Sequence, residues 1–273
     1  IDYRFYQKFY KHAWILSVIL LVAVKLIGTE VNGAKRWISI TKTLSFQPSE
    51  LVKFLMIIFY AAILVKNRDE LKLYGKGFIK HFLYLVPIIG LLILEPHLSA
   101  SMVIIGIVSI MMIVAGCKFK HFVLTGLGAG SPLLFAAIAF SPYRLERFVT
   151  FLDPWKDATD SGWQVIQSLY AIGSGGLFGV GLGDSKQKYL YLPEPYTDFI
   201  FAIIVEELGA ISGIGIILLY MFVLYRILII GKRSYTNRGA LMCYGIAIYI
   251  FCHIAINLLG LFGLMPLTGV PLP

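Results

Sequence analysis

The run FIFAIIVEELGAISGIGIILLYMFVLYRILII, residues 199–230, decides the fold class. A transmembrane helix needs about 20 mostly apolar residues to cross roughly 30 Å of hydrocarbon. This run is longer than that, and its only charged residues are Glu206, Glu207 and Arg226. It predicts a long, tilted membrane helix. Two adjacent acids at that depth require a protein partner or a polar cavity, so at least one should support the structure.

The composition extends this conclusion to the whole chain of 273 residues. Hydrophobic residues make up 58%, charged residues only 14%, and the mean hydropathy is +0.80, which excludes an ordinary soluble domain. Further apolar runs of spanning length, or nearly so, lie at 13–28, 50–65, 82–95, 101–116, 121–140 and 240–262. We therefore expect an all-α polytopic membrane protein with about seven transmembrane helices, forming one membrane domain over residues 1–273.

Basic residues set the expected orientation, since Lys and Arg near span ends are retained in the cytoplasm. With the N-terminus inside, the inner segments carry 13 cations against three acids. The outer segments 29–53 and 141–198 carry nine cations, interleaved with more acids. The net charge of +9 therefore reflects topology signals and contact with anionic membrane lipid, while the outer cations suggest a site for a phosphorylated substrate.

The first outer loop supplies candidate site residues, which are Lys35, Arg36 and Trp37. A turn is predicted before them at Asn32-Gly33, and a tryptophan suits the aromatic belt of the membrane interface. Glu50 opens the next span and Lys53 follows one turn later, so the two side chains share a face of a membrane helix. Such a pair is either a structural ion pair or part of a site.

The second outer loop, residues 141–198, is longer than a connection between two spans requires, and such loops usually carry function. Arg144 and Arg147 lie three residues apart, on one side of a helical turn, which suits them to phosphate oxygens. Residues 160–172 predict a capped amphipathic helix in the membrane interface. Its expected apolar side consists of Trp163, Ile166, Leu169 and Tyr170.

Glycines then recur from Gly173 to Gly183. A nucleotide-binding loop is excluded, because no strand precedes the glycines and no Gly-Lys-Ser/Thr closes them. Flexible turns packed against the interface are the commoner explanation, and backbone amides that cradle a diphosphate are the other. Lys186 and Lys188 follow directly and add slight support to the second.

Asp198 lies where this polar loop meets the apolar run that begins at Phe199. A carboxylate there contacts water on one side and a low dielectric on the other, which makes its basicity tunable. The helix also needs an N-cap, which Thr197 or Asp198 can supply. Position alone leaves the catalytic and the capping roles open.

The cysteines and the chain ends add two expectations. The three cysteines lie in or beside apolar runs without metal-ligand spacing, so neither disulfides nor a metal site is expected from them. The sequence begins with Ile1 and stops at Pro273, directly after a span. We expect a fragment, truncated at both ends, with further spans on each side.

Several motifs in order resemble the SEDS family of bacterial shape, elongation, division and sporulation proteins. They are GAKRWI (33–38), FQPSELVK (46–53), RLERF (144–148), QSLYAIGSGGLFG (167–179), YLPEPYTDFIFA (191–202) and PLTGVPLP (266–273). Residues 95–99, EPHLS, are closer to the division and sporulation branch (FtsW, SpoVE) than to RodA. The resemblance runs from the first loop to the last residue and implies ten spans in a complete protein.

The resemblance implies a peptidoglycan glycosyltransferase that polymerises lipid II, the undecaprenyl-diphosphate-linked disaccharide-pentapeptide. The reaction would take place at the outer face of the bacterial cytoplasmic membrane. Asp198 matches the family's essential loop aspartate, a general base for the 4-hydroxyl of the acceptor sugar. Inversion at the anomeric carbon then needs no second carboxylate as nucleophile. Trp37 matches a tryptophan required for activity, whereas Tyr196 stands where the family often has histidine.

The departing diphosphate must be stabilised by cations or by a divalent metal ion, Mg²⁺ or Mn²⁺. The residues expected to bind substrate are Lys35, Arg36, Trp37, Glu50, Lys53, Arg144, Arg147, Lys186 and Lys188. No other cofactor is implied.

Two other functions are compatible with the same motifs. A lipid II flippase would line its path with intramembrane charges such as Glu206, Glu207 and Lys53. A non-catalytic scaffold would only recruit a class B penicillin-binding protein, a transpeptidase. The expected partners are lipid II, that transpeptidase and membrane lipid, and no nucleic acid.

Overall fold

The computed structural model describes residues 5, 8–31, 34–39, 41, 45–95, 97–130, 151–158, 162–189, 192 and 195–273. The chain divides into two compact units. Unit 1 comprises Ile1–Thr125 and Arg226–Tyr249, and unit 2 comprises Gly126–Tyr225 and Ile250–Pro273. Two long helices, α11 (Ile200–Lys232) and α12 (Asn237–Leu261), contribute residues to both units.

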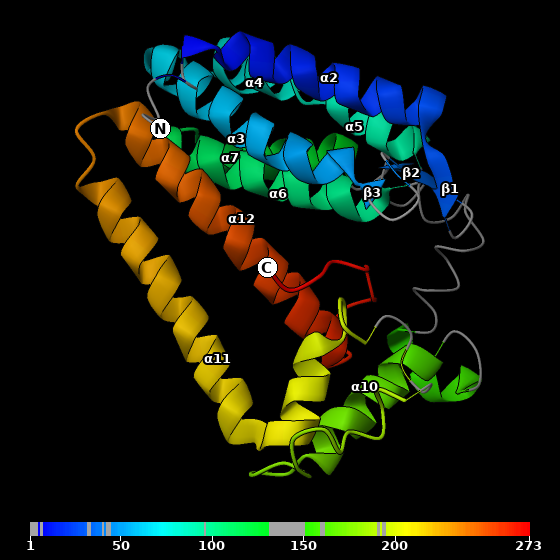
Figure 1. Ribbon diagram of the computed structural model, residues 1–273. Helices are drawn as coiled ribbons and strands as arrows, with labels where there is room; N and C mark the ends of the chain where they lie inside the picture. The colour runs from blue at the N-terminus through cyan, green and yellow to red at the C-terminus, as the bar shows by residue number, and fades with distance from the viewer. Residues whose placement is uncertain are drawn as a thin grey trace. The chain divides into compact units, whose positions relative to one another are not determined.

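Unit 1 is a helical bundle in which α3 is central. The bounds of α3 are Pro48–Lys66. The other helices of this bundle are α2 (Tyr10–Ile27), η1 (Arg68–Glu70), η2 (Tyr74–Ile79), α4 (Lys80–Leu83), α5 (Val86–Leu94), α6 (Leu98–Ala115) and α7 (Phe119–Thr125). Helix α3 contacts α2 and α6, and α5 contacts the same two helices (Figure 1). Val52, Met56, Tyr60 and Leu64 recur every four residues along α3 and are all buried, which places this apolar row in the core.

A small antiparallel sheet follows α2, and the sequence did not predict it. It consists of β1 (Thr29–Val31), β2 (Ala34–Ser39) and β3 (Ser45–Phe46), in the order β1-β2-β3. Thr29 pairs with Trp37, and Ile38 pairs with Phe46. The strands are too short, and too rich in charge, to show the alternation that identifies a strand. The turn predicted at Asn32-Gly33 lies outside the described residues.

Unit 2 contains η3 (Gly126–Gly130), η4 (Pro154–Asp157), α10 (Trp163–Ser174), the first part of α11 and the end of α12. Helix α10 confirms the predicted helix, but its buried face differs from the predicted one. Ile166 is buried as expected, whereas Tyr170 is 51% exposed. The buried side instead includes Ala171 and Ser168, whose Oγ donates to the carbonyl of Leu261 at 2.9 Å. Val165 and Gln167 are buried as well, so the buried side of α10 mixes polar and apolar residues and is rotated from the predicted one.

Helix α11 is broken at Gly209, whereas the apolar run 199–230 predicts one long helix. Its φ of 83° and ψ of 172° belong to a region that is essentially restricted to glycine. The neighbouring loop leaves no room for a side chain, since a Cβ at Gly209 would lie 2.2 Å from the carbonyl oxygen of Leu177. The yellow ribbon turns sharply at this point (Figure 1).

The glycine-rich segment 176–181 satisfies the backbone groups that the break leaves without helical partners. The N–H of Val180 donates to the carbonyl of Glu206 at 2.9 Å, and the N–H of Gly181 donates to the carbonyl of Glu207 at 3.1 Å. On the other side of the break, the N–H of Ala210 donates to the carbonyl of Gly176 at 2.9 Å. Irregular backbone at membrane depth persists only where protein supplies such partners.

Six helices in the described part of the chain are long and apolar enough to cross a membrane. They are Tyr10–Ile27, Pro48–Lys66, Tyr74–Leu94, Leu98–Ala115, Ile200–Lys232 and Asn237–Leu261. These correspond to six of the seven predicted runs. The seventh run, 121–140, is described only as far as residue 130, and the remainder lies outside the described residues.

A polar turn between α5 and α6 buries two ionisable groups. Glu95 is 3% exposed, and the ring of His97 is partly buried. Burial raises the pKa of Glu95 to about 7, although nearby Lys25 and Arg36 oppose the shift. Burial also lowers the pKa of His97 to about 3, with the positive charges of Arg36 and Lys53 adding to the effect. His97 is therefore neutral at physiological pH, and Glu95 titrates there.

Replacing Gly209 by alanine should destabilise unit 2, because the new Cβ meets backbone atoms and the conformation disfavours any side chain. We expect a loss of about 2–4 kcal/mol, read as a lower thermal unfolding midpoint in detergent. Gly215→Ala is the matched control on the same helix, since a Cβ there has no neighbour within 4 Å. Equal midpoints for the two variants would contradict the strained break.

The elevated pKa of Glu95 predicts a pH-dependent stability. The carboxyl group ionises near its ordinary value of 4.5 in the unfolded chain but holds its proton to about 7 in the fold. Stability should therefore decline as pH rises from about 4.5 to about 7 and level off above, by roughly 1–3 kcal/mol. Unfolding midpoints across this range should fall less in Glu95→Gln, whereas Glu30→Gln, at an exposed position, should follow the parent.

Candidate functional site

Asp198 lies in the last turn before α11, half-buried, in a segment whose backbone is fixed by side chains from α12. The Nδ2 group of Asn257 donates to the carbonyl oxygen of Asp198 at 2.8 Å. The same amide donates to the carbonyl of Val270 at 2.9 Å. A side-chain amide has two N–H donors, and both are used here. One residue thus joins the Asp198 turn to the C-terminal segment.

The carboxylate of Asp198 faces that C-terminal segment. Gly269 has a φ of 63°, and a Cβ at that position would lie 3.4 Å from Oδ2 of Asp198. His253 Nδ1 lies 3.4 Å from the carbonyl of Pro271, and Tyr220 Oη donates to the carbonyl of Pro273. Polar side chains therefore hold the segment along its length, and glycine keeps the space beside the carboxylate open.

A buried apolar cluster packs beside the turn that contains Asp198. It contains Ala171, Leu192, Phe199, Phe201, Ala202, Ile203, Val205 and Leu261, all buried, with Leu258, Leu267 and Leu272 packed against it. Phe199 follows Asp198 directly, so the acid is attached to a rigid apolar base. The backbone of Asp198 is therefore held in place, and its side chain is half-buried.

The two acids of α11 support the loop rather than lining an open path. Glu206, 2% exposed, accepts from Ser185 Oγ at 2.5 Å and from the backbone N–H of Lys186 at 3.0 Å. Glu207 forms an ion pair with Lys188 at 2.6 Å. The hydrogen bond that Lys188 Nζ donates to Glu207 raises the pKa of Lys188. The side chain of Lys186 is exposed.

A second polar cluster lies in unit 1, at the start of α3. Lys53 is 2% exposed, and its Nζ lies 2.8 and 3.0 Å from the two carboxylate oxygens of Glu50. Tyr249 Oη donates to Glu50 at 3.4 Å, and its ring lies 5.8 Å from the ammonium group. A buried ammonium so close to a carboxylate avoids the cost of an isolated charge. The predicted sharing of one helix face is confirmed.

The other predicted residues fall into two groups. Lys35, Arg36 and Trp37 lie on β2, with the lysine exposed and the other two partly buried. Arg144 and Arg147 lie outside the described residues. Within the described part of the chain, no group of three or more His, Cys, Asp or Glu residues is arranged to hold a metal ion.

Sequence reasoning missed Asn257 and Tyr249, which contact predicted site residues. Each is a polar residue within the apolar run 240–262, and a buried polar group in a membrane helix needs a partner. That signal marks Asn257 as a candidate, since it is the only amide side chain in the run. Tyr249 is not distinguishable from an ordinary interfacial aromatic by sequence.

A family model and curated relatives all match this chain over most of its length. The family model described as "Cell cycle protein", FTSW_RODA_SPOVE, matches residues 1–273. The "Probable peptidoglycan glycosyltransferase FtsW" of Saccharophagus degradans is 42% identical over 264 residues, covering 95% of this chain and 68% of that protein. "Stage V sporulation protein E" of Bacillus subtilis is 38% identical over 275 residues, covering all of this chain and 75% of the relative.

Solved structures agree with the family match. A structure described as "Structural coordination of polymerization and crosslinking by a peptidoglycan synthase complex" has a TM-score of 0.82 and 30% identity, covering 100% of this chain and 76% of the other. The crystal structure of rod shape determining protein RodA of Thermus thermophilus has a TM-score of 0.70 and 26% identity. The match covers 100% of this chain and 72% of RodA. The chain therefore belongs to the FtsW/RodA/SpoVE family of polytopic membrane proteins, as its motifs predicted.

Proposed function

We propose that this protein is a peptidoglycan glycosyltransferase, which polymerises lipid II at the outer face of the bacterial cytoplasmic membrane with Asp198 as the general base. Its family membership and the names of its relatives support the activity. The single observation that carries the residue assignment is the clamped, half-buried position of Asp198 beside the C-terminal segment.

In the proposed reaction, the carboxylate of Asp198 accepts the proton of the acceptor sugar's 4-hydroxyl group. The oxygen attacks the anomeric carbon of the donor, and the bond from that carbon to the diphosphate oxygen breaks with inversion. The electron pair leaves with the undecaprenyl diphosphate. One base and a group that stabilises the leaving diphosphate are sufficient for such a displacement.

Cationic side chains are the proposed ligands of the departing diphosphate. Lys35 and Arg36 on β2 are proposed for this role, and Arg144 and Arg147 add a paired guanidinium motif by sequence, whereas Lys53 is buried and engaged by Glu50. Glu50 holds Lys53 in place by an ion pair, and Trp37 is proposed to contact the substrate. In the described loop, Lys186 is exposed for this role, whereas Lys188 is engaged by Glu207.

A class B penicillin-binding transpeptidase is the proposed partner, because a structural neighbour coordinates polymerization and crosslinking within a peptidoglycan synthase complex. A flippase gains no support from the described residues. Its candidate charges Glu206, Glu207 and Lys53 are each occupied by a hydrogen bond or an ion pair within the protein.

Replacing Asp198 by asparagine should remove the base while keeping the shape of the side chain. With purified lipid II and the full-length protein, we expect glycan-strand synthesis on gels to fall by about 10²–10⁴-fold. Asp184→Asn, an exposed acid on the same loop, is the control and should retain the parental rate. Strand synthesis at the parental rate by Asp198→Asn would rule out the assignment.

Asn257 is proposed as a positioning residue for Asp198. Asn257→Leu leaves two backbone carbonyls without their donor, so we expect polymerisation to slow by about tenfold or more. The loss should fall on kcat rather than KM. A double-mutant cycle separates this role from general stability: in the Asp198→Asn background, Asn257→Leu should have little further effect on rate. Fully additive losses would show that Asn257 acts independently of Asp198.

A further inference from the structure

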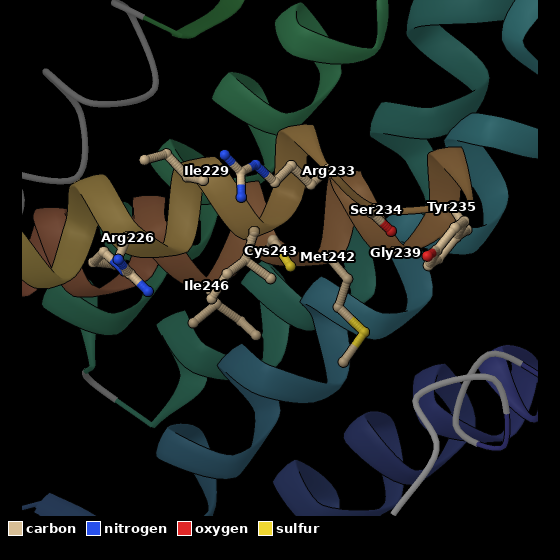
Figure 2. A pocket seen from close by; sticks show the side chains of 10 residues that line it. Arg226, Ile229, Arg233, Ser234, Tyr235, Gly239, Met242, Cys243 and Ile246 are labelled. Carbon is tan, nitrogen blue, oxygen red and sulfur yellow. The ribbon is translucent and has the colours of Figure 1, made fainter.

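A groove lies where the end of α11 meets the start of α12, entirely within unit 1. Its volume is about 500 Å³, within the range of small-molecule sites. Ile229, Met242 and Ile246 provide an apolar lining, and Arg226 and Arg233 provide two guanidinium groups (Figure 2). The helices approach closely at Gly231, which is buried: a Cβ there would lie 3.1 Å from the Cβ of Cys243.

Arg226 lies on α11 and Arg233 directly follows its last residue, and both line the groove. They are seven residues apart, which corresponds to two helical turns and a rise of about 10.5 Å. Both side chains are exposed, and neither takes part in any ion pair found among the described residues. The sequence offers no local acid, because no Asp or Glu occurs from residue 208 to residue 273.

Arg226 occupies an unfavourable position unless an anion reaches it. It lies six residues before the end of α11, about 9 Å into the span. Its neighbours Tyr225, Leu228 and Ile230 are exposed apolar side chains of a membrane helix. A cation on such a surface is costly without a counter-ion or contact with the headgroup region.

We propose that this groove binds an anionic phospholipid from the membrane leaflet that contains the α11–α12 turn. Arg226 and Arg233 bind the phosphate oxygens, as paired guanidinium groups do elsewhere. An acyl chain lies along Ile229, Met242 and Ile246. The combination of two unpaired cations with an apolar floor fits a lipid phosphate better than a free phosphate, which would leave the floor exposed to water.

The proposal is tested on the detergent-solubilised full chain by native mass spectrometry. Phosphatidylglycerol and phosphatidylcholine with identical acyl chains are titrated separately. The unmodified protein should bind phosphatidylglycerol more tightly. Arg226→Gln/Arg233→Gln should weaken that binding by about thirty-fold and abolish the preference, since each cation near a lipid headgroup contributes about fivefold.

Lys232→Gln/Arg238→Gln is the matched control, because it removes the same charge from the same hairpin at positions that do not line the groove. Its affinity should stay within about threefold of the parent. Equal retention of both lipids by the unmodified protein would overturn the proposal even if the groove variant failed to fold. Equal losses in the two double variants would overturn it too, by indicating non-specific charge attraction. Competition by inorganic phosphate would contradict the acyl-chain contact.

Discussion

Every backbone polar group inside a membrane needs a hydrogen-bond partner, and this constraint explains how unit 2 is built. Helix α11 breaks at Gly209 within its first third, and the groups freed by the break are bonded by residues 176–181. The loop that carries Lys186 and Lys188 is therefore fixed to the helix that begins beside Asp198. Glu206 and Glu207 strengthen the same attachment through their side chains. A break that would be destabilising alone becomes the means of docking an otherwise irregular loop.

The contact between this loop and α11 also shows the role of the glycines from 175 to 181, which is close packing. Val180 and Gly181, whose amides could have cradled a diphosphate, donate instead to carbonyls of α11. Glycine is required for close contact: a Cβ at Gly175 or Gly179 would lie 2.1 Å from a carbonyl oxygen of α11. Of the two explanations left open by sequence, packed turns are the one that the structure supports at these residues. We therefore propose that negative charge on a substrate is met by side chains such as Arg36.

Long periodic features could be predicted from the sequence, and features that depend on distant partners could not. The spans, the helix at α10 and the Glu50–Lys53 pair follow from local spacing and composition, and the motif resemblance to the family is confirmed. The break at Gly209 was missed because a glycine is tolerated within many membrane helices, and only the packed loop reveals its conformation. The exposure of Tyr170 was missed because the buried side of α10 includes the polar residues Gln167 and Ser168, which a pattern of apolar residues does not reveal. Asn257 acts through carbonyls at Asp198 and Val270, which no local pattern connects.

The shared amide of Asn257 makes Asp198 and the tail at residues 264–273 mechanically dependent on each other. Moving this segment away from α12 would break the hydrogen bond from Asn257 to Val270 and would remove Gly269 from beside the Asp198 carboxylate. The surroundings of Asp198 therefore depend on a segment that is distant from it in the sequence, and a change in that segment would reach the carboxylate directly. The two hydrogen bonds of Asn257 together contribute about 1–3 kcal/mol to this arrangement.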